Sequence, residues 1–202
     1  EGGGLYISSL ISNLDVSLHD GYIQRNSCDR YGGGICVDMS ETSMSADVYV
    51  GGNIDGVNGD PQITGNFAMV EGGGLYTSGT NTHIIFNDGM IQNNTVSGYV
   101  ENPNVANVGG LVTLNGGDVT HIVVTFDGNK GYTTDGTLSE TAIQKIVTNT
   151  RSLLVTPEFA RAGWEFVEWT DRADGTGEVY RNGQEINRKT NLTLYARWRL
   201  VQ

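Results

Sequence analysis

The chain has 202 residues, enough for one large or two small domains, and its formal net charge is −11. Because an acidic protein repels phosphate backbones, we expect no nucleic-acid partner. The sequence has no apolar run of about 18 residues, the length that a membrane-spanning helix needs, so we expect no membrane insertion.

Charge and glycine are distributed unevenly along the chain. Residues 1–118 contain 13 acidic residues, two basic residues and 22 glycines. Residues 119–202 contain ten acidic residues, ten basic residues and seven glycines. This change of composition predicts two domains, 1–118 and 119–202.

The first domain contains a glycine-based repeat. The triplets that begin at Gly2, Gly32 and Gly72 each precede an aliphatic residue, and Gly109 and Gly110 precede Leu111. Phrases with alternating apolar residues follow the triplets at 15–21, 47–52 and 83–89, and this period of two is typical of β-strands. We therefore predict three short strands per repeat, with glycine and asparagine at the corners.

Tandem repeats of short strands predict a right-handed parallel β-helix, in which each repeat is one coil and equivalent residues stack. The predicted internal column consists of Leu5, Ile35, Leu75 and Leu111. A second column of Tyr6, Cys36 and Tyr76 is expected outside it.

Asn26, Asn66 and Asn94 close the last phrase of each repeat. These side chains are open to two interpretations, polar ligands for a partner or an internal ladder of hydrogen-bonded amides. We favour the ladder, because the asparagines occur at a repeated corner and buried amides require partners.

The third repeat contains a longer segment before its next glycines. Fourteen residues separate Asn94 from Gly109, compared with five between the ladder asparagine and the next glycines in the first two repeats. We interpret the difference as a nine-residue loop that leaves the barrel. Because loops on rigid scaffolds carry recognition, Tyr99, Glu101, Asn102 and Asn104 are the predicted ligand-binding residues. The alternative is a passive insertion that covers the end of the helix.

Residues 53–60 contain oxygen-bearing side chains at close spacing. Asp55, Asn58 and Asp60 are candidates for binding calcium, although they lack the ligand spacing of an EF-hand. The sequence has no zinc-ligand spacing, and we expect no other cofactor. Cys28 and Cys36 are close enough in sequence to pair in an exported protein, but their number alone implies no disulfide.

Catalytic candidates are few. Asp15, Asp38 and Asp47 are predicted near strand ends, and His19 and His83 near one corner. Scattered acidic residues are typical of solvated surfaces, so we expect a protein that is not an enzyme. The alternative is a fragment of a β-helix polysaccharide lyase or glycoside hydrolase.

The glycine triplets and the "Gly-x-Ile-x-x-Asn" phrases over residues 1–117 resemble the β-helix repeats of bacterial surface proteins, including the pectate-lyase-like and polymorphic outer-membrane protein families. The resemblance implies a fold and a location without implying a reaction. Because the repeated phrase already begins at residue 1, we expect further coils or a cap before it.

The second domain contains three diagnostic phrases, "FDGN" from Phe126, "GWEF" with Trp169 after it, and "TLYARW" ending at Trp198. Together they resemble the internalin-type B-repeat, or Listeria–Bacteroides repeat. The residues indicate a small β-grasp-like α+β domain, with a helix over 139–150 and a hairpin turn at 174–177. The expected core is Phe166, Trp169, Leu192, Leu194 and Trp198. The alternative for the aromatic residues is a platform on which sugars stack.

These resemblances imply a non-catalytic module of a large exported bacterial cell-surface protein. Its expected role is adhesion, or that of a stalk, in contact with a host protein, a matrix protein or a glycan. The expected location is extracellular.

Overall fold

The computed structural model describes residues 2–54, 56–98 and 102–202. These residues form strands and turns, with no helix among them and hence none long and apolar enough to cross a membrane. The prediction of a mainly β protein is confirmed. The chain divides into unit 1, Glu1–His121 with Val147–Ser152, and unit 2, Ile122–Ile146 with Leu153–Gln202.

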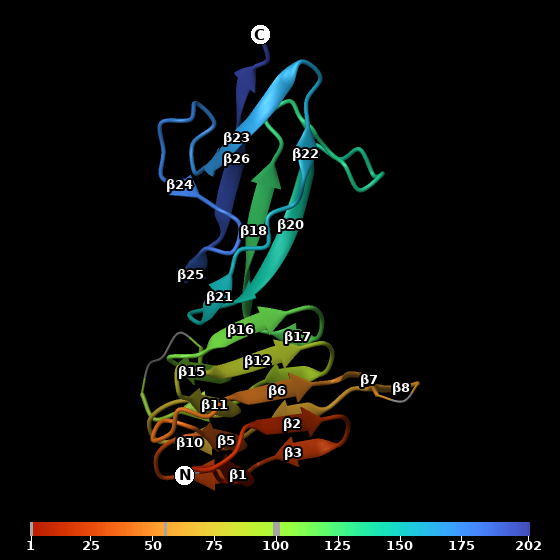
Figure 1. Cartoon of the computed structure of the whole chain (residues 1–202). Helices are drawn as coiled ribbons and strands as arrows, with labels where there is room; N and C mark the ends of the chain where they lie inside the picture. Colours follow the sequence, from red (N-terminus) through yellow and green to blue (C-terminus); the bar gives the residue numbers. More distant parts are fainter. Residues whose placement is uncertain (1, 55, 99–101) are drawn as a thin grey trace. The chain divides into compact units, whose positions relative to one another are not determined.

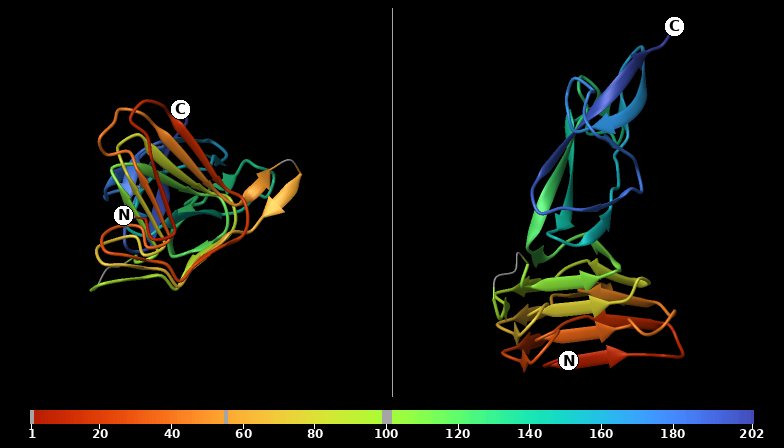
Figure 2. Two further views of the ribbon diagram at one scale, coloured as in Figure 1. Left: turned by 90° about the horizontal axis from the view of Figure 1, so that it is seen from below. Right: turned by 90° about the vertical axis from the view of Figure 1, so that its left-hand side faces the viewer.

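Unit 1 is a stack of coils, here called the coil stack, whose strands pair in parallel with the equivalent strands of the next coil (Figures 1 and 2). The first coil comprises β1 (Leu5–Ser8), β2 (Leu14–Leu18), β3 (Tyr22–Gln24) and β4 (Ser27–Cys28). The second comprises β5 (Ile35–Asp38), β6 (Ala46–Val50), β9 (Gln62–Thr64) and β10 (Phe67–Ala68). The third comprises β11 (Leu75–Ser78), β12 (Thr82–Phe86), β13 (Met90–Gln92) and β14 (Thr95–Val96). The fourth comprises β15 (Val105–Val108), β16 (Leu111–Leu114) and β17 (Asp118–Val119).

The strands form four parallel sheets, in the orders β1-β5-β11-β15, β2-β6-β12-β16, β3-β9-β13-β17 and β4-β10-β14. The first three coils therefore have four strands each, one more than predicted. The additional strand is only two residues long, too short to show an alternating pattern in the sequence.

The predicted internal column is correct for three of its four members. Leu5 lies opposite Ile35, and Ile35 lies opposite Leu75. The fourth member is Val105 and not Leu111, which pairs with His83 in the neighbouring sheet. The glycines before Leu111 therefore do not correspond to the earlier triplets.

Aliphatic side chains from three of the sheets fill the interior of the coil stack. Ile35, Val48, Ile63 and Leu75 belong to this cluster and are at most 1% exposed. At the corner before each ladder asparagine the backbone has a positive φ, 57° at Arg25, 66° at Gly65 and 55° at Asn93. Glycine and asparagine tolerate this left-handed conformation, which agrees with the predicted corner chemistry at two of the three coils.

Unit 2 contains a five-stranded sheet in the order β20-β18-β26-β23-β24. Its strands are β18 (His121–Asp127), β20 (Thr141–Val147), β23 (Trp164–Thr170), β24 (Val179–Tyr180) and β26 (Leu192–Leu200). The shorter strands of this unit include β19 (Tyr132–Thr133), β22 (Phe159–Ala160) and β25 (Glu185–Asn187), whereas β21 (Arg151–Leu153) falls at the boundary between Ser152 of unit 1 and Leu153 of unit 2. β19 pairs antiparallel with β22.

The predicted helix over 139–150 is wrong, and with it the β-grasp-like α+β class. Residues 141–147 form the edge strand β20, in which Ala142, Gln144 and Ile146 are more buried than the residues between them. The spacing of Ala142, Ile143 and Ile146 suits one helical face, but the segment is rich in β-branched residues, which favour a strand. Pairing within the sheet outweighs the helical pattern, because it satisfies the backbone of a segment with weak helix propensity.

The core of unit 2 is aromatic and aliphatic. Trp169, Leu192 and Leu194 are buried as predicted, and Trp198 packs against them while partly exposed. Phe166 departs from the prediction, because 39% of it is exposed to solvent.

Candidate ligand-binding sites

The asparagines of the coil stack form the predicted ladder. Asn66 Oδ1 accepts hydrogen bonds from the backbone N–H and from Nδ2 of Asn26, each at 3.0 Å. Asn94 Oδ1 accepts the same pair from Asn66 at 2.9 Å. The Nδ2 groups of Asn66 and Asn94 also donate to the carbonyls of Ile23 and Ile63. The structural interpretation of these three asparagines is confirmed.

Asn104 is the fourth rung of this ladder. Its Oδ1 accepts hydrogen bonds from the backbone N–H and Nδ2 of Asn94, each at 3.1 Å. Asn104 occupies the backbone position that Gly74 occupies one coil earlier. The Asn104 carbonyl accepts a hydrogen bond from the Leu75 N–H, and the Gly74 carbonyl accepts the equivalent hydrogen bond from the Ile35 N–H. At Gly74 a side chain would collide with the ladder, because a Cβ there would lie 2.7 Å from Asn94 Nδ2. At Asn104 the side chain belongs to the ladder and accepts the hydrogen bond from Asn94 Nδ2.

Asn102 completes the end of the ladder. Its Oδ1 accepts hydrogen bonds from the backbone of Asn104 and Val105, each at 3.2 Å, and its Nδ2 donates to the Thr148 carbonyl at 2.9 Å. Thr148 belongs to the segment Val147–Ser152, which the sequence assigned to the second domain. Within unit 1, Val147 joins the core of the coil stack, so this segment covers its last coil.

The register of β15 changes the length of the predicted insertion. Nine positions separate the ladder asparagine from the next strand in the first two repeats, and eleven separate Asn94 from Val105. This segment of the third repeat is therefore two residues longer than the equivalent segments of the first two repeats. Asn102 and Asn104 are buried, at 6% and 8% exposure, which removes the reason for treating them as ligand-binding residues. Tyr99 and Glu101, the other two predicted residues, lie outside the described part of the chain.

Two of the three calcium candidates, Asn58 and Asp60, belong to the segment between β6 and β9, which contains a hairpin. Its strands are β7 (Gly52–Ile54) and β8 (Val57–Gly59), which project from the coil stack (Figure 1). Asn58 Oδ1 already accepts from Asn53 Nδ2 at 3.0 Å, Asp60 is exposed, and Asp55 lies outside the described residues. Within residues 2–54, 56–98 and 102–202, no group of three His, Cys, Asp or Glu side chains is arranged to hold a metal ion.

Three of the catalytic candidates occupy one column of the coil stack. Asp15 lies opposite Asp47, and Asp47 lies opposite His83, on the outer face of the β2-β6-β12-β16 sheet. His83 Nε2 is 2.8 Å from Thr113 Oγ1. Asp38 belongs to a different sheet, where its Oδ1 accepts from the hydroxyls of Ser40 and Ser78.

The predicted column of Tyr6, Cys36 and Tyr76 forms in the predicted register, but only Tyr6 is exposed, whereas Cys36 and Tyr76 are buried. Cys28 and Cys36 are buried and are not joined in a disulfide. A hollow of about 260 Å³ lies beside this column, with Tyr6, Ser8, Asp38 and Glu41 among its lining residues. Burial alone would raise the pKa of Asp38, but hydrogen bonds from Ser40 and Ser78 outweigh it and leave the pKa below its ordinary value. Asp38 is therefore an ionised residue of the coil surface at neutral pH.

A β-bulge arranges the aromatic side chains of unit 2. In the pairing of β23 with β26, Phe166 lies opposite Trp198 and Trp169 lies opposite Ala196, with a register shift between Phe166 and Glu168. The bulge puts Phe166 and Trp169 on the same face although three positions separate them. Their ring centroids are 5.3 Å apart.

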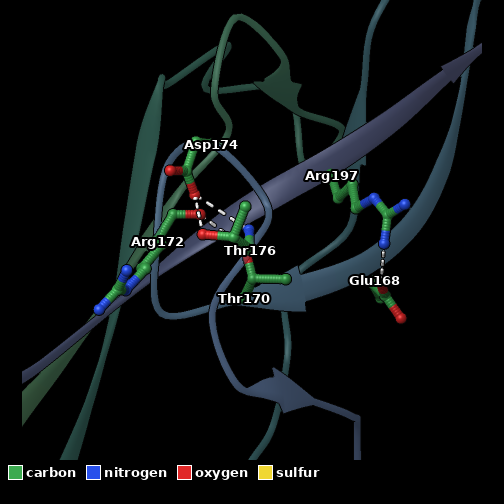
Figure 3. A network of polar contacts seen from close by, with 6 residues as sticks. All are labelled: Glu168, Thr170, Arg172, Asp174, Thr176 and Arg197. Atoms are coloured by element: carbon green, nitrogen blue, oxygen red, sulfur yellow. Dashed lines mark hydrogen bonds and ion pairs between the residues drawn. The ribbon is translucent and has the colours of Figure 1, made fainter.

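The opposite face of these strands is charged. Arg197 pairs with Glu168 at 2.6 Å, and Arg199 pairs with Glu165 at 2.5 Å. Figure 3 shows the first pair beside the turn that joins β23 to β24, where Asp174 accepts from the N–H and the hydroxyl of Thr176. The predicted hairpin turn at 174–177 is confirmed by the antiparallel pairing of β23 with β24.

Sequence reasoning therefore missed two features of unit 2, the exposure of Phe166 and the bulge that turns it toward Trp169. The spacing contained a signal for the bulge. Residues three positions apart face opposite sides of a regular strand, so placing both Phe166 and Trp169 in one core already requires an irregularity.

Comparison with known proteins bears on the second half of the chain. Comparisons with curated proteins and with solved structures give no match. Residues 123–197, from β18 to β26, match the family model of the Listeria-Bacteroides repeat domain, which confirms the resemblance derived from the "FDGN", "GWEF" and "TLYARW" phrases.

Proposed function

We propose that this chain is a non-catalytic module of an exported bacterial cell-surface protein, in which a right-handed parallel β-helix is followed by a Listeria-Bacteroides repeat. The match over residues 123–197 carries the proposal, because this repeat is found in surface proteins. In this role the chain works outside the cell as an adhesin or stalk. Its partner is a host protein, a matrix protein or a glycan.

The coil stack supports a mechanical role. Successive coils pair in register along four sheets, and the asparagine ladder links the coils through buried hydrogen bonds. Stacked repeats of this kind contact only their neighbours, so the architecture extends in one direction by adding coils. A stalk requires this property.

One observation favours the competing class, a polysaccharide lyase or glycoside hydrolase. Asp15, Asp47 and His83 share a column on an outer sheet face, and enzymes that cleave glycosidic bonds use carboxylates at short separation. We prefer the non-catalytic function, because acidic residues on an outer strand face are also the usual means of keeping a sheet soluble.

Two measurements test the proposal. An antibody against this chain should label intact cells that express the parent protein, since the module is exported. The purified chain, incubated with a panel of polysaccharides with and without calcium, should release neither reducing ends nor unsaturated products. Labelling that requires permeabilised cells would refute the proposed location at the cell surface. Turnover that Asp47→Asn abolishes would establish the enzyme instead.

A further inference from the structure

Unit 2 contains a groove with an aromatic floor. The cavity has a volume of about 350 Å³, and Phe159, Phe166 and Trp169 contribute its aromatic lining. Phe159 and Trp169 are 8% and 2% exposed, whereas Phe166 is 39% exposed. The groove thus offers one accessible ring, Phe166, supported from below by buried rings.

The accessible ring is held in place by its neighbours. Phe166 packs against Trp169 at 5.3 Å and, edge to face, against Trp198 at 5.8 Å between ring centroids. Trp169 in turn meets Phe159 edge to face at 5.5 Å. A ring fixed in this way loses little conformational freedom when a ligand stacks on it, which favours binding.

The rim of the groove is polar and acidic. Thr134 Oγ1 donates to Glu158 Oε2 at 3.4 Å, and the Thr156 N–H donates to Asn182 Oδ1 at 3.1 Å. These bonds orient a carboxylate and an amide beside the exposed ring. The residues that line the groove include no arginine, lysine or histidine.

A second cavity of about 360 Å³ continues the groove. It shares Thr134, Pro157 and Glu158 with the first cavity and adds Asp135. Hydrogen bonds from the Thr137 hydroxyl and N–H hold the pKa of Asp135 below its ordinary value, so this carboxylate is ionised at neutral pH. The two cavities together form an extended site with two acidic groups.

Trp169, one of the residues that line the groove, carries an unsatisfied donor. Trp169 Nε1 is buried and has no hydrogen-bond acceptor among the described residues. A buried donor without a partner is rare in folded proteins, because it costs the free energy of its desolvation.

We propose that this groove binds an oligosaccharide of hexose units that carry no acidic group. A sugar ring presents an apolar face that stacks on Phe166 and hydroxyl groups that donate to Glu158 and to Asp135. Two adjoining cavities suit at least two sugar units. The inference rests on the proposed function only in that it selects a glycan among the possible partners.

The charges at the rim select among glycans. Because Glu158 and Asp135 are acidic and the groove lining contains no basic residue, uronic acids and sulfated sugars meet repulsion there. Neutral and amino sugars carry no negative charge, so the two carboxylates do not repel them. The groove is therefore expected to discriminate by charge as well as by shape.

The test measures binding of defined hexasaccharides to the full chain by calorimetry and tryptophan fluorescence, since Trp169 lines the groove. The probes are the hexamers of glucose in α1,4 and β1,4 linkage, of N-acetylglucosamine and of glucosamine, with hexagalacturonate as the acidic probe. At least one non-acidic hexamer should bind at least about tenfold more tightly than hexagalacturonate, which corresponds to about 1.4 kcal/mol. Failure of every non-acidic probe to bind would overturn the proposal.

Matched variants locate the site. Phe166→Leu keeps an apolar side chain without a ring and should weaken binding by about tenfold or more, whereas Phe166→Tyr should retain it. Ile143→Ala changes an exposed apolar residue of β20, which does not line the groove, and should leave binding unchanged. Glu158→Gln should reduce the discrimination against hexagalacturonate.

The opposite results would contradict the inference. Binding that survives Phe166→Leu would exclude a sugar groove. A peptide of arginine and tryptophan that binds more tightly than every hexasaccharide would also exclude it. Labelling of intact cells is independent of these variants. Surface labelling without hexasaccharide binding would therefore refute the groove and leave the proposed function standing.

Discussion

The two units are stabilised in different ways. The core of unit 1 is almost entirely aliphatic, and its polar ladder repeats from coil to coil. The core of unit 2 centres on Trp169, which meets Phe126 and Phe159 edge to face. A residue of unit 1 is thus supported by its equivalents one coil away, whereas a residue of unit 2 is supported by a single cluster.

Glycine illustrates the same difference. In unit 1, a Cβ at Gly33 would lie 2.3 Å from the carbonyl oxygen of Phe67, so glycine permits two coils to approach. In unit 2, a Cβ at Gly131 would lie 2.4 Å from the ring of Trp198, so glycine makes room for an aromatic side chain. The same residue type serves backbone stacking in one unit and side-chain packing in the other.

The two units are separable in experiments. All three tryptophans, Trp164, Trp169 and Trp198, belong to unit 2, so tryptophan fluorescence reports the unfolding of that unit alone. Far-ultraviolet circular dichroism reports both units.

The largest effect is expected for Trp169→Ala, which removes the centre of the aromatic cluster. Since Trp169 is 2% exposed, the free energy of unfolding of unit 2 should fall by about 4 kcal/mol. Urea denaturation followed by the fluorescence of the remaining tryptophans measures the change. Phe166→Ala is the control and should cost about 1 kcal/mol, because the ring is already partly solvated. Equal losses would show that unit 2 has no such centre.

Asn66→Leu should lower the free energy of unfolding of unit 1 by about 3 kcal/mol. The N–H and Nδ2 of Asn26 lose their acceptor, and Asn94 Oδ1 loses one of its two donors. Denaturation followed by circular dichroism measures this loss, and the tryptophan transition should not move. Asn58→Leu, in the exposed hairpin, should cost less than about 0.5 kcal/mol. Similar losses for the two variants would count against the ladder as a source of stability.

A smaller effect is expected from Tyr76 at alkaline pH. Burial raises the pKa of Tyr76 to about 12, with contributions from Tyr31 and Glu71, whereas the unfolded value is about 10. The stabilisation is therefore complete below about pH 10 and is lost as the pH rises toward 12. Tyr76→Phe should flatten the fall in the stability of unit 1 over this interval. Tyr22→Phe, at a position 77% exposed, should not.

The smallest effect is expected for the ion pair of Arg199 and Glu165. Both side chains are largely exposed, at 70% and 57%, so solvent screens the pair and it should contribute almost nothing to stability. A double-mutant cycle with Arg199→Met and Glu165→Gln measures the coupling. A coupling clearly larger than the error of the cycle would mean that surface charge, and not only the aromatic cluster, stabilises unit 2.

Much of unit 1 was predictable because its signals are local and repeated. Alternating apolar residues predicted β2, β6 and β12, and a shared offset from the glycine triplets predicted that Asn26 and Asn66 occupy one corner. The same pattern occurs in the same order in successive repeats, and this recurrence distinguishes it from a chance pattern. The repeat failed only at the last coil, where Asn102, Pro103 and Asn104 stand in place of the glycine triplet.

The candidate groove was predictable only in part. The aromatic phrases of unit 2 and the alternative of a sugar platform were visible in the sequence. The exposure of Phe166, the bulge beside it and the position of Glu158 at the rim depend on the pairing of β23 with β26 and on the fold of β22 against β19. These contacts join residues that are distant in the chain.

The sequence by itself determined the mainly β character, the ladder and the turn at 174–177, because strand periodicity, amide pairing and turn chemistry act over a few residues or repeat at a fixed interval. Only the tertiary structure decided that 141–147 is a strand, that Val147–Ser152 belongs to unit 1 and that Val105 continues the internal column. In each case the deciding free energy comes from pairing or burial against a distant segment, and no local pattern records it.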